Sequence, residues 1–376
     1  MSKVFDIVID FKKSHGSYVY DKKSQGVFLD FYSMYSSLPL GYNHPIFDET
    51  FKEKVVDIAS LRMTNNVFSS DEYEQFVNQF SSHVFSKNIH FTCTGALAVE
   101  SAVKAAMHYK KVKEPFVVGV KNSFHGINSW GFLTDRTGIN QKRLEYFPQN
   151  NWYHLDLDEI IELLENKDIE NLVAIIVEPI QCTNGDIYLD KVKLQRIRQI
   201  CLRKDVCFIL DEIQTGFGVT GKMWYYEYLE LIPDILVFGK KAQVCGLCTN
   251  DKYAEILQNP YQKLDVTFDG ELIDMVRAGY VLKAYSEFNL LEKVRENSEI
   301  LRNQLSGLSK NYRSIGHLIA FDFDSTAHRD EFLKSCYANK VIVNRSGEKA
   351  VRLRPNLALA QDELDAFVSI VASILN

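Results

Sequence analysis

The sequence lacks the features that mark membrane and secreted proteins. No stretch approaches the roughly 18 uninterrupted apolar residues that a membrane-spanning helix needs. The first ten residues are acidic and show no basic segment followed by an apolar run, so they do not resemble a secretory signal peptide. We therefore expect a cytoplasmic protein with no membrane partner.

Cysteine is too sparse and too scattered for a disulfide framework. The chain has 7 cysteines, an odd number, and most of them lie inside apolar runs, which is typical of reduced thiols in a cytosolic protein. Cys245 and Cys248 form a Cys-x-x-C pair. Without a second pair or a nearby histidine, this spacing favours core packing over metal binding. We predict no bound metal.

The sequence also lacks an excess of basic charge. Its 43 Lys and Arg against 49 Asp and Glu give a net charge of −6. Such a chain has no global field that attracts nucleic acid, so we expect no nucleic-acid partner. With 376 residues, 46% hydrophobic and 24% charged, it has the composition of a globular protein and the length of about two domains.

The middle of the chain alternates short apolar runs with segments of helical length. The runs are rich in Val, Ile and Phe, as expected for strands that are covered on both faces. This alternation predicts an α/β domain with a mostly parallel sheet, where ligands bind at the carboxyl ends of the strands. The expected strands are residues 89–93, 116–120, 173–177, 207–210 and 235–238, and the expected helices are 97–111, 156–166 and 189–203.

The two ends of the chain have a different pattern. Residues 17–20 and 26–31 indicate short extended pieces around a Lys-rich turn. After residue 282 we expect long helices, then a strand pair at 316–322 and 341–344, and a last helix at 362–375. We predict a smaller α+β domain built from both termini, with segments 1–45 and 281–376 flanking a large domain at 46–280.

Three of the expected strands end on residues that could carry chemistry. Gly95, after the first, would let backbone amides cradle a phosphate at the start of a helix, or would simply form a tight turn. The acids Asp211 and Glu212, after the fourth, would hold a cationic partner or cap a helix. Lys240, after the fifth, could form a Schiff base, or could be a solvated lysine like Lys241.

Two more of the expected strands are followed by residues that could carry chemistry. Glu178 follows the third strand, and the run Phe124-His125-Gly126 follows the second. A cofactor with a phosphate, an aromatic face, a basic ring nitrogen and an aldehyde would use all five strand ends. Pyridoxal 5'-phosphate (PLP) has these four features. The joint occurrence therefore predicts a PLP-dependent enzyme.

Longer motifs carry a resemblance to a known family. Residues 211–218 read DEIQTGFG and residues 233–240 read PDILVFGK. With these motifs the chain resembles the class III aminotransferases of PLP fold type I. It is similar above all to the L-lysine 6-aminotransferases, through GALAVE at 95–100, FGKKAQVCG at 238–246 and DMVRA at 274–278. The resemblance runs from about residue 8 to the last residue. It implies a seven-stranded, mostly parallel sheet and a homodimer with shared active sites.

The resemblance also implies roles for single residues around the cofactor ring. Lys240 would form the Schiff base with PLP and move the substrate proton, and Asp211 would pair with the pyridinium nitrogen. Phe124 and Ile213 would pack on the two ring faces, and Gln214 would bond the ring hydroxyl.

The resemblance also implies residues that bind the cofactor phosphate and the substrate carboxylate. The amides of Gly95 and Ala96 would bind the cofactor phosphate, together with Thr267 contributed by the partner subunit. Glu178 would belong to the same cofactor site. Arg352 would bind a substrate α-carboxylate through a bidentate fork, unless it forms an ion pair at a domain interface.

Three positions depart from the family pattern. Ile127 replaces an Arg that often anchors a carboxylate, Thr183 replaces a Glu that shields the carboxylate-binding Arg, and Ala96 replaces Ser or Thr. A fixed Arg–carboxylate contact contributes about 1.5–3 kcal/mol, and this contribution is lost at Ile127. We expect glutamate or a similar amino acid to donate through Arg352 in a ping-pong cycle, to an aldehyde or keto acceptor that need not derive from lysine.

Three alternatives stay open at this point. The same cofactor could serve a racemase, an aminomutase or a decarboxylase. The fold could belong to a binding protein that has lost turnover. Asp211, Glu212 and His125 could form a metal site, although they lack the close spacing of typical ligand sets.

Overall fold

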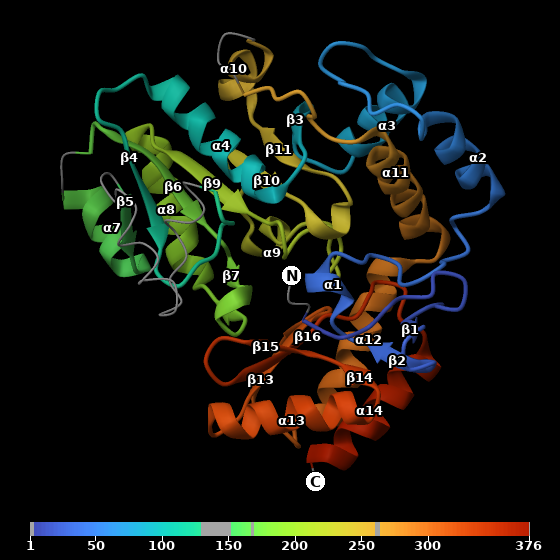
Figure 1. Ribbon diagram of the computed structural model, residues 1–376. Helices are drawn as coiled ribbons and strands as arrows, with labels where there is room; N and C mark the ends of the chain where they lie inside the picture. Colours follow the sequence, from blue (N-terminus) through green and yellow to red (C-terminus); the bar gives the residue numbers. More distant parts are fainter. Residues whose placement is uncertain (1–3, 129–151, 167–168, 260–263, 376) are drawn as a thin grey trace. The chain divides into compact units, whose positions relative to one another are not determined.

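The computed structural model describes residues 4–128, 152–166, 169–259 and 264–375, and the chain forms two compact units (Figure 1). The larger unit holds Lys54–Phe217 and Met223–Gly279. The smaller unit holds Met1–Glu53, Gly218–Lys222 and Tyr280–Asn376, so it is assembled from both ends of the chain and one short central segment. We call them the large unit and the small unit and describe each by itself.

A seven-stranded sheet forms the centre of the large unit, in the order β3-β11-β10-β9-β6-β4-β5. Only β11 runs against its neighbours, because it pairs antiparallel with both β10 and β3 while the other pairs are parallel. The predicted α/β class with a mostly parallel sheet is confirmed. The strands are β3 (Asn88–Thr92), β4 (Phe116–Val120), β5 (Trp152–Leu155), β6 (Leu172–Val177), β9 (Cys207–Asp211), β10 (Ile235–Phe238) and β11 (Cys245–Thr249).

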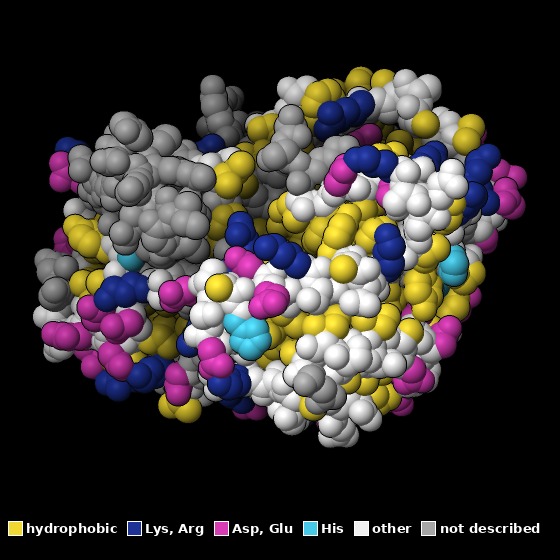
Figure 2. All heavy atoms as spheres, turned by 60° about the horizontal axis from the view of Figure 1, so that its bottom comes forward, with side chains coloured by type: hydrophobic (Ala, Val, Ile, Leu, Met, Phe, Trp, Pro, Cys, Tyr) yellow, Lys and Arg dark blue, Asp and Glu magenta, His cyan; other side chains and the backbone are white. Residues whose placement is uncertain are grey.

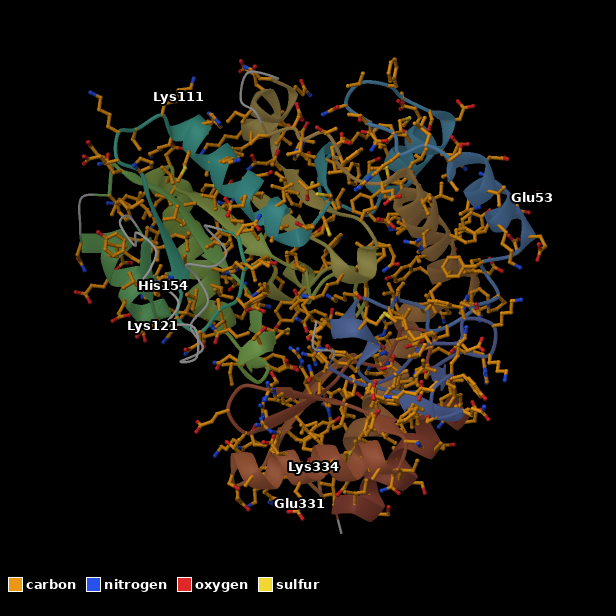
Figure 3. All side chains as sticks on the ribbon, viewed as in Figure 1. Glu53, Lys111, Lys121, His154, Glu331 and Lys334 are labelled. Carbon is orange, nitrogen blue, oxygen red and sulfur yellow. The ribbon has the colours of Figure 1, made fainter. Side chains whose placement is uncertain are left out.

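Helices of the large unit cover this sheet. Helix α4 begins after Thr94, whose hydroxyl accepts a hydrogen bond from the Leu97 amide at 3.2 Å, and its alanines let it pack closely on β6, β9 and β10. It ends at Lys110, and the residue that follows, Lys111 (labelled in Figure 3), is in the left-handed conformation, with φ 53°. The helices here are α3 (Asp71–Ser81), α4 (Gly95–Lys110), α7 (Leu157–Asn166), α8 (Lys191–Lys204), α9 (Tyr226–Leu229) and α10 (Ala254–Gln258).

All five predicted strands of this sheet are present within one residue at each end, but β5 and β11 were not predicted. In β11 the pattern is hidden by Gly246, an unusual residue in a strand. A Cβ at Gly246 would lie 2.3 Å from the His90 carbonyl oxygen of β3, so only glycine allows the two backbones to approach this closely. The cysteines Cys245 and Cys248 are two of its residues, and Cys248 is buried.

The small unit contains two sheets, ordered β1-β2-β14 and β12-β13-β16-β15. Its core joins the two ends of the chain, because the ring of Phe31 stacks on that of Phe367 with 3.6 Å between centroids. The elements are β1 (Tyr18–Asp21), β2 (Gly26–Asp30), the left-handed turn α1 (Ser33–Ser36), α12 (Leu290–Leu305), β12 (Lys310–Ile315), β13 (Leu318–Asp322), α13 (Thr326–Ala338), β14 (Val341–Ile342), β15 (Asn344–Ser346), β16 (Ala350–Leu353) and α14 (Gln361–Leu375). Helices α2 (Glu49–Ile58) and α11 (Leu272–Glu287) contain residues of both units.

The expected pairing of segments 316–322 and 341–344 is wrong. Strand β13, in the first segment, pairs with β12 and β16, whereas β14, in the second, pairs in parallel with β2 near the N-terminus. Val341 lies opposite Leu29 and Ile342 opposite Asp30. The partner of β14 is thus about 300 residues away, and no local pattern identifies it.

The distribution of charged side chains on the surface agrees with the small net charge of the chain. On the face shown in Figure 2, Lys and Arg side chains alternate with Asp and Glu, and no wide field of one sign is formed. None of the helices in the described ranges has the length and apolar character needed to cross a bilayer.

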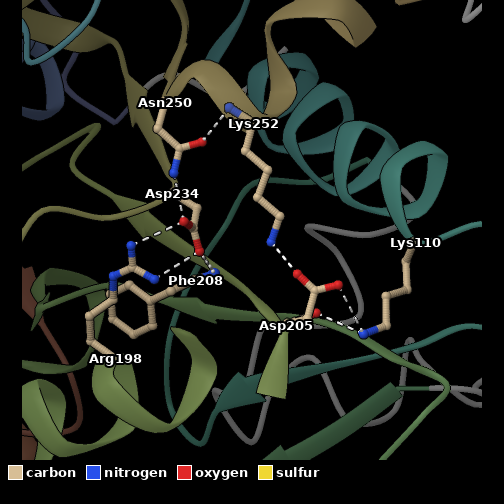
Figure 4. A network of polar contacts seen from close by, with 7 residues as sticks. All are labelled: Lys110, Arg198, Asp205, Phe208, Asp234, Asn250 and Lys252. Atoms are coloured by element: carbon tan, nitrogen blue, oxygen red, sulfur yellow. Dashed lines mark hydrogen bonds and ion pairs between the residues drawn. The ribbon is translucent and has the colours of Figure 1, made fainter. Parts of the chain in front are cut away.

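A buried ion pair ties α8 to the start of β10 (Figure 4). The guanidinium of Arg198 donates to both carboxylate oxygens of Asp234, at 2.9 and 3.0 Å. Asp234 also accepts the Phe208 amide of β9 at 3.0 Å and the Asn250 side-chain amide at 2.7 Å. Because Asp234 lies directly before β10, this network sets the register of β9 and β10 at their amino ends.

We predict that Arg198→Ala destabilises the large unit far more than Arg196→Ala on the same helix. Removing Arg198 leaves the Asp234 charge buried without its cation, which costs about 3–5 kcal/mol. Arg196 pairs with Glu165 at the surface, and such pairs contribute about 1 kcal/mol or less. Urea unfolding followed by circular dichroism compares the two midpoints, and equal shifts would contradict the assignment.

Candidate active site

The carboxyl ends of the parallel strands meet at one edge of the large unit's sheet. In the pairing of β9 with β10, Asp211 lies beside Val237, and the Glu212 amide donates to the Val237 carbonyl at 2.9 Å. Lys240 follows Val237 by three residues. Asp211 and the turn that holds Lys240 therefore leave the sheet at the same edge.

The side chain of Ile213 connects two of the strand ends. A Cβ built on Gly95 would lie 2.9 Å from Ile213 Cδ1, and one built on Gly239 would lie 3.4 Å from Ile213 Cγ2. Ile213 thus packs against the turn after β3 and against the turn that leads to Lys240. The structure brings these three predicted site segments together.

The turn after β4 joins the same group. Gly126 has φ +106°, and a Cβ there would lie 2.8 Å from the Cβ of Ala96. The turn containing Phe124, which is half-buried, is therefore in contact with the glycine turn at the start of α4. Only glycine combines this backbone conformation with so close an approach.

Lys240 has a strained backbone. It opens a short 3-10 helix, Lys240–Ala242, with φ 50°, and it is half-buried. Non-glycine residues with positive φ are uncommon and gather at functional sites, where the surrounding fold maintains the strain. Lys241, expected as the solvated neighbour, is instead buried, with 2% of its surface exposed.

Asp211 is held in one orientation by two hydrogen bonds. Its side chain is buried, and Oδ2 lies 2.7 Å from His125 Nδ1. The other oxygen, Oδ1, accepts the Ile213 amide at 3.0 Å. A carboxylate fixed in this way can present a negative charge to a cation in one direction.

Glu212 has a different role from its neighbour. Its carboxylate accepts the backbone amides of Tyr225 at 2.5 Å and Tyr226 at 2.7 Å, so it caps α9. Burial raises the pKa of Glu212 to about 8, against the lowering effect of these hydrogen bonds. The carboxylate of Glu212 is therefore directed to α9, and the described residues contain no group of three or more His, Cys, Asp or Glu side chains that could hold a metal ion.

The carboxylate of Glu178 binds the backbone of the turn after β4. Its Oε2 accepts the Phe124 amide at 3.0 Å, and its Oε1 accepts the Cys182 amide at 3.1 Å. Burial raises the pKa of Glu178 to about 7; nearby His125 opposes this shift and nearby Asp211 adds to it. In this structure Glu178 thus holds the backbone at Phe124 and at Cys182.

The other predicted site residues differ in their burial and in the unit to which they belong. Gln214 and Thr183 are half-buried in the large unit, whereas Ile127 has 75% of its surface exposed and Thr267 is exposed. Arg352 lies on β16 of the small unit, buried, opposite Ala320 and Asn344.

His125 is the residue that the sequence analysis undervalued. It was noted only as the neighbour of Phe124 and as part of the metal alternative, yet it contacts Asp211 directly. Its position at a strand end, beside a residue predicted to stack on the cofactor, was the available signal. The spacing of 86 residues to Asp211 gave no hint of the contact.

The assembled residues fit PLP. The amides at the start of α4 can bind a phosphate. The glycines at 95 and 126 let Ile213 and Ala96 pack closely against this turn. The Asp211 carboxylate suits a protonated ring nitrogen, and the Lys240 amine suits the aldehyde.

Comparison with known proteins identifies the family. Residues 2–375 match the aminotransferase class-III family, and the chain belongs to that family. It is 30% identical to the L-lysine-epsilon aminotransferase of Mycobacterium tuberculosis, over 98% of this chain and 92% of the relative. It is 29% identical to the 4-aminobutyrate aminotransferase of Saccharomyces cerevisiae, over 100% of this chain and 93% of the relative.

Solved structures agree with this assignment. Lysine aminotransferase from M. tuberculosis matches with a TM-score of 0.92 at 29% identity, over 99% of this chain and 95% of that one. Ornithine aminotransferase from Toxoplasma gondii has the same fold, with a TM-score of 0.87 at 23% identity, over 100% of this chain and 91% of that one. The resemblance to class III and the fold type I architecture are confirmed. The chain is thus a PLP-dependent aminotransferase that acts on small amines and keto compounds.

We predict that Gly126→Ala weakens PLP binding by roughly tenfold or more, because the new Cβ strains the backbone by about 1–3 kcal/mol and pushes on Ala96. Gly307→Ala is the matched control, since a Cβ there meets nothing within 4 Å. Fluorescence titration of each apoenzyme with PLP measures the affinity. Unchanged affinity in Gly126→Ala would show that this contact does not shape the cradle.

Proposed function

We propose that this enzyme moves an amino group from an amino-acid donor, glutamate or a close analogue, to an aldehyde or keto acceptor in a ping-pong cycle. The observation that carries the proposal is the meeting of Asp211, Ile213 and the Lys240 turn at one edge of the sheet. Class III membership supports the transfer reaction itself.

We assign the chemistry at the ring to side chains of the large unit. When bound, PLP supplies an aldehyde that takes the amine and a ring that accepts electrons. Lys240 binds the aldehyde in the resting enzyme and moves the proton next to the substrate nitrogen, as general base and then acid. Asp211 holds the positive charge of the ring nitrogen. Phe124 and Ile213 orient the ring between them.

The remaining proposed contacts bind the phosphate and the ring hydroxyl of the cofactor. Backbone amides of Gly95 and Ala96 bind the phosphate, which is supported by their place at the amino end of α4. Gln214 bonds the ring hydroxyl. We further propose a homodimer in which Thr267, exposed in this chain, reaches the phosphate of the partner's site.

Substrate selection in this proposal depends on Arg352. This buried side chain binds the donor α-carboxylate by a bidentate fork. The relatives act, by their names, on lysine and 4-aminobutyrate. Where the family resemblance implies an Arg that anchors a second carboxylate, this chain has Ile127, and where it implies a Glu that shields the carboxylate-binding Arg, it has Thr183. The acceptor therefore need not share the lysine skeleton.

We predict that Lys240→Ala lowers the rate of amino transfer by at least about a thousandfold, because the base next to the reacting carbon is lost. Borohydride reduction of the PLP-loaded enzyme, followed by peptide mapping, should place the cofactor on Lys240. Lys241→Met is the neighbouring control and should keep both the label and the activity. A label on Lys241 would transfer the role to that residue.

A second prediction concerns the donor. Arg352→Ala should raise KM for glutamate roughly 10- to 150-fold, the loss of a contact of about 1.5–3 kcal/mol, whereas Arg345→Ala, an exposed arginine on β15, should leave it unchanged. Initial rates over both substrates should give parallel lines.

Initial rates measured over a panel of acceptors test whether Ile127 and Thr183, in place of the Arg and Glu that the family resemblance implies, change the acceptor preference. We expect good activity with aldehydes that carry no distal carboxylate. A clear preference for lysine with 2-oxoglutarate, or intersecting initial-rate lines, would contradict the proposal.

A further inference from the structure

Thr267, which we propose to bind the cofactor phosphate of the partner's site, lies on an exposed loop of the large unit. The loop, residues 264–271, leads into α11 (Figure 1), and both Thr267 and the adjacent Phe268 are exposed. A loop that is ordered only when it binds a ligand loses affinity through the entropy of ordering. Contacts that fix this loop in advance therefore strengthen phosphate binding.

The side chain of Asn65, between α2 and α3, binds the end of this loop. Its Nδ2 donates to Asp269 Oδ1 at 3.1 Å and to the Gly270 carbonyl at 3.0 Å. The backbone amide of Asn65 also donates to Asp269 Oδ1, at 3.2 Å. Because both partners of Nδ2 are acceptors, the orientation of the side-chain amide is fixed. We call these three hydrogen bonds the Asn65 clamp.

The Asn65 clamp is buried, although the loop is exposed at Thr267. Asn65 is 8% exposed and Asp269 is 9% exposed. A carboxylate at such a place needs donors, and both hydrogen bonds that the described residues donate to it come from Asn65. The clamp therefore holds the acid inside the large unit, away from the exposed surface to which Thr267 belongs.

A second contact joins the same two segments next to Thr267. The guanidinium of Arg62 lies over the ring of Phe268, 3.9 Å from its centroid. Such a stack is weak at an exposed site, but it places a cation beside the residue that follows Thr267. A positive charge at this place favours the approach of a phosphate.

The segment that carries Asn65 also exposes large apolar side chains. Leu61, Val67 and Phe68 are all exposed. Apolar side chains that are exposed together are typical of a surface that another protein molecule covers. This agrees with the proposed homodimer, in which the Thr267 loop acts across the subunit interface.

We propose that Asn65 is a positioning residue for the partner's active site: its clamp fixes the loop in the conformation in which Thr267 binds the cofactor phosphate of the other subunit. This inference rests on the proposed homodimer and on the proposed role of Thr267. Asn65 touches neither cofactor nor substrate in this proposal, because it acts through Asp269 and Gly270.

The first test uses the apoenzyme and does not depend on the cofactor. Asn65→Asp keeps the size of the side chain but replaces the donor Nδ2 by an oxygen that faces two acceptors. We expect amide hydrogen exchange in residues 264–271 to become about tenfold faster or more, because the loop opens more often. Asn65→Ala removes the same donor without adding a charge and should give a smaller change in the same direction.

Asn66→Asp is the matched control. It adds the same charge one position further on, where the exposed Asn66 side chain contacts the Val266 carbonyl at 3.4 Å. Exchange in residues 264–271 should stay close to that of the wild type. Equal exchange in Asn65→Asp and Asn66→Asp would overturn the clamp.

The second test asks which active site the clamp serves. Mixed dimers are assembled from two differently tagged chains, one of which carries Lys240→Ala. After borohydride reduction, only the other chain can carry the PLP label on Lys240. The PLP concentration that gives half-maximal labelling thus measures the affinity of one site.

The position of Asn65→Asp in the mixed dimer decides the outcome. On the chain with Lys240→Ala, it should raise the half-maximal PLP concentration roughly tenfold, because the loop that reaches the intact site has lost its hydrogen bonds. On the chain that keeps Lys240, it should leave that concentration near the wild-type value. The reverse pattern would show that the clamp serves its own site, and equal losses would show general destabilisation; either result overturns the proposal.

Thr267→Ala separates this inference from the proposed function. If Thr267→Ala weakens PLP binding in the homodimer and Asn65→Asp does not, the clamp is wrong and the role of Thr267 stands. If Thr267→Ala leaves PLP affinity unchanged, the proposed role of Thr267 is wrong. Faster exchange in Asn65→Asp would then still support the clamp on the loop, but its action on the partner's site would be overturned.

Discussion

The 2.7 Å contact between His125 and Asp211 is the interaction on which the rest of the site depends. It fixes a buried carboxylate at the carboxyl end of β9, a strand with β6 on one side and β10 on the other. The order of the sheet therefore places Glu178, which follows β6, on one side of Asp211 and the turn with Lys240, which follows β10, on the other side. A fixed carboxylate next to a turn that carries an amine suits a cofactor with a cationic ring and an aldehyde.

Rigidity at the opposite end of the same strands supports this arrangement. Asp234 accepts the Phe208 amide and holds Arg198, so β9 and β10 are locked in register where they begin. At about 3.3 Å per residue, Asp211 lies roughly 10 Å along β9 from Phe208, where this alignment is fixed. The strained φ of Lys240, which costs on the order of 1–3 kcal/mol, persists because the buried strand before it cannot relax.

The residues proposed for the chemistry and the residue proposed for donor binding lie on different parts of the chain. The residues proposed to handle the ring all belong to the large unit, whereas Arg352 belongs to the small unit. The motifs around Asp211 and Lys240 carry the family resemblance, whereas the proposed departures from it are at Ile127 and Thr183. Such a division allows the anchors of a substrate to change while the transfer reaction stays the same.

Local sequence patterns were sufficient to predict the class of the fold, the strands at 116–120 and 235–238, and a set of residues expected to hold PLP. Runs of Val, Ile and Phe specify buried strands locally, and motifs around Asp211 and Lys240 are contiguous in the chain. The antiparallel direction of β11, the pairing of β14 with β2, the capping of α9 by Glu212 and the contact of Asp211 with His125 became visible only in the three-dimensional fold. These outcomes depend on contacts between segments far apart in sequence, where burial and backbone approach, not local pattern, select the partner.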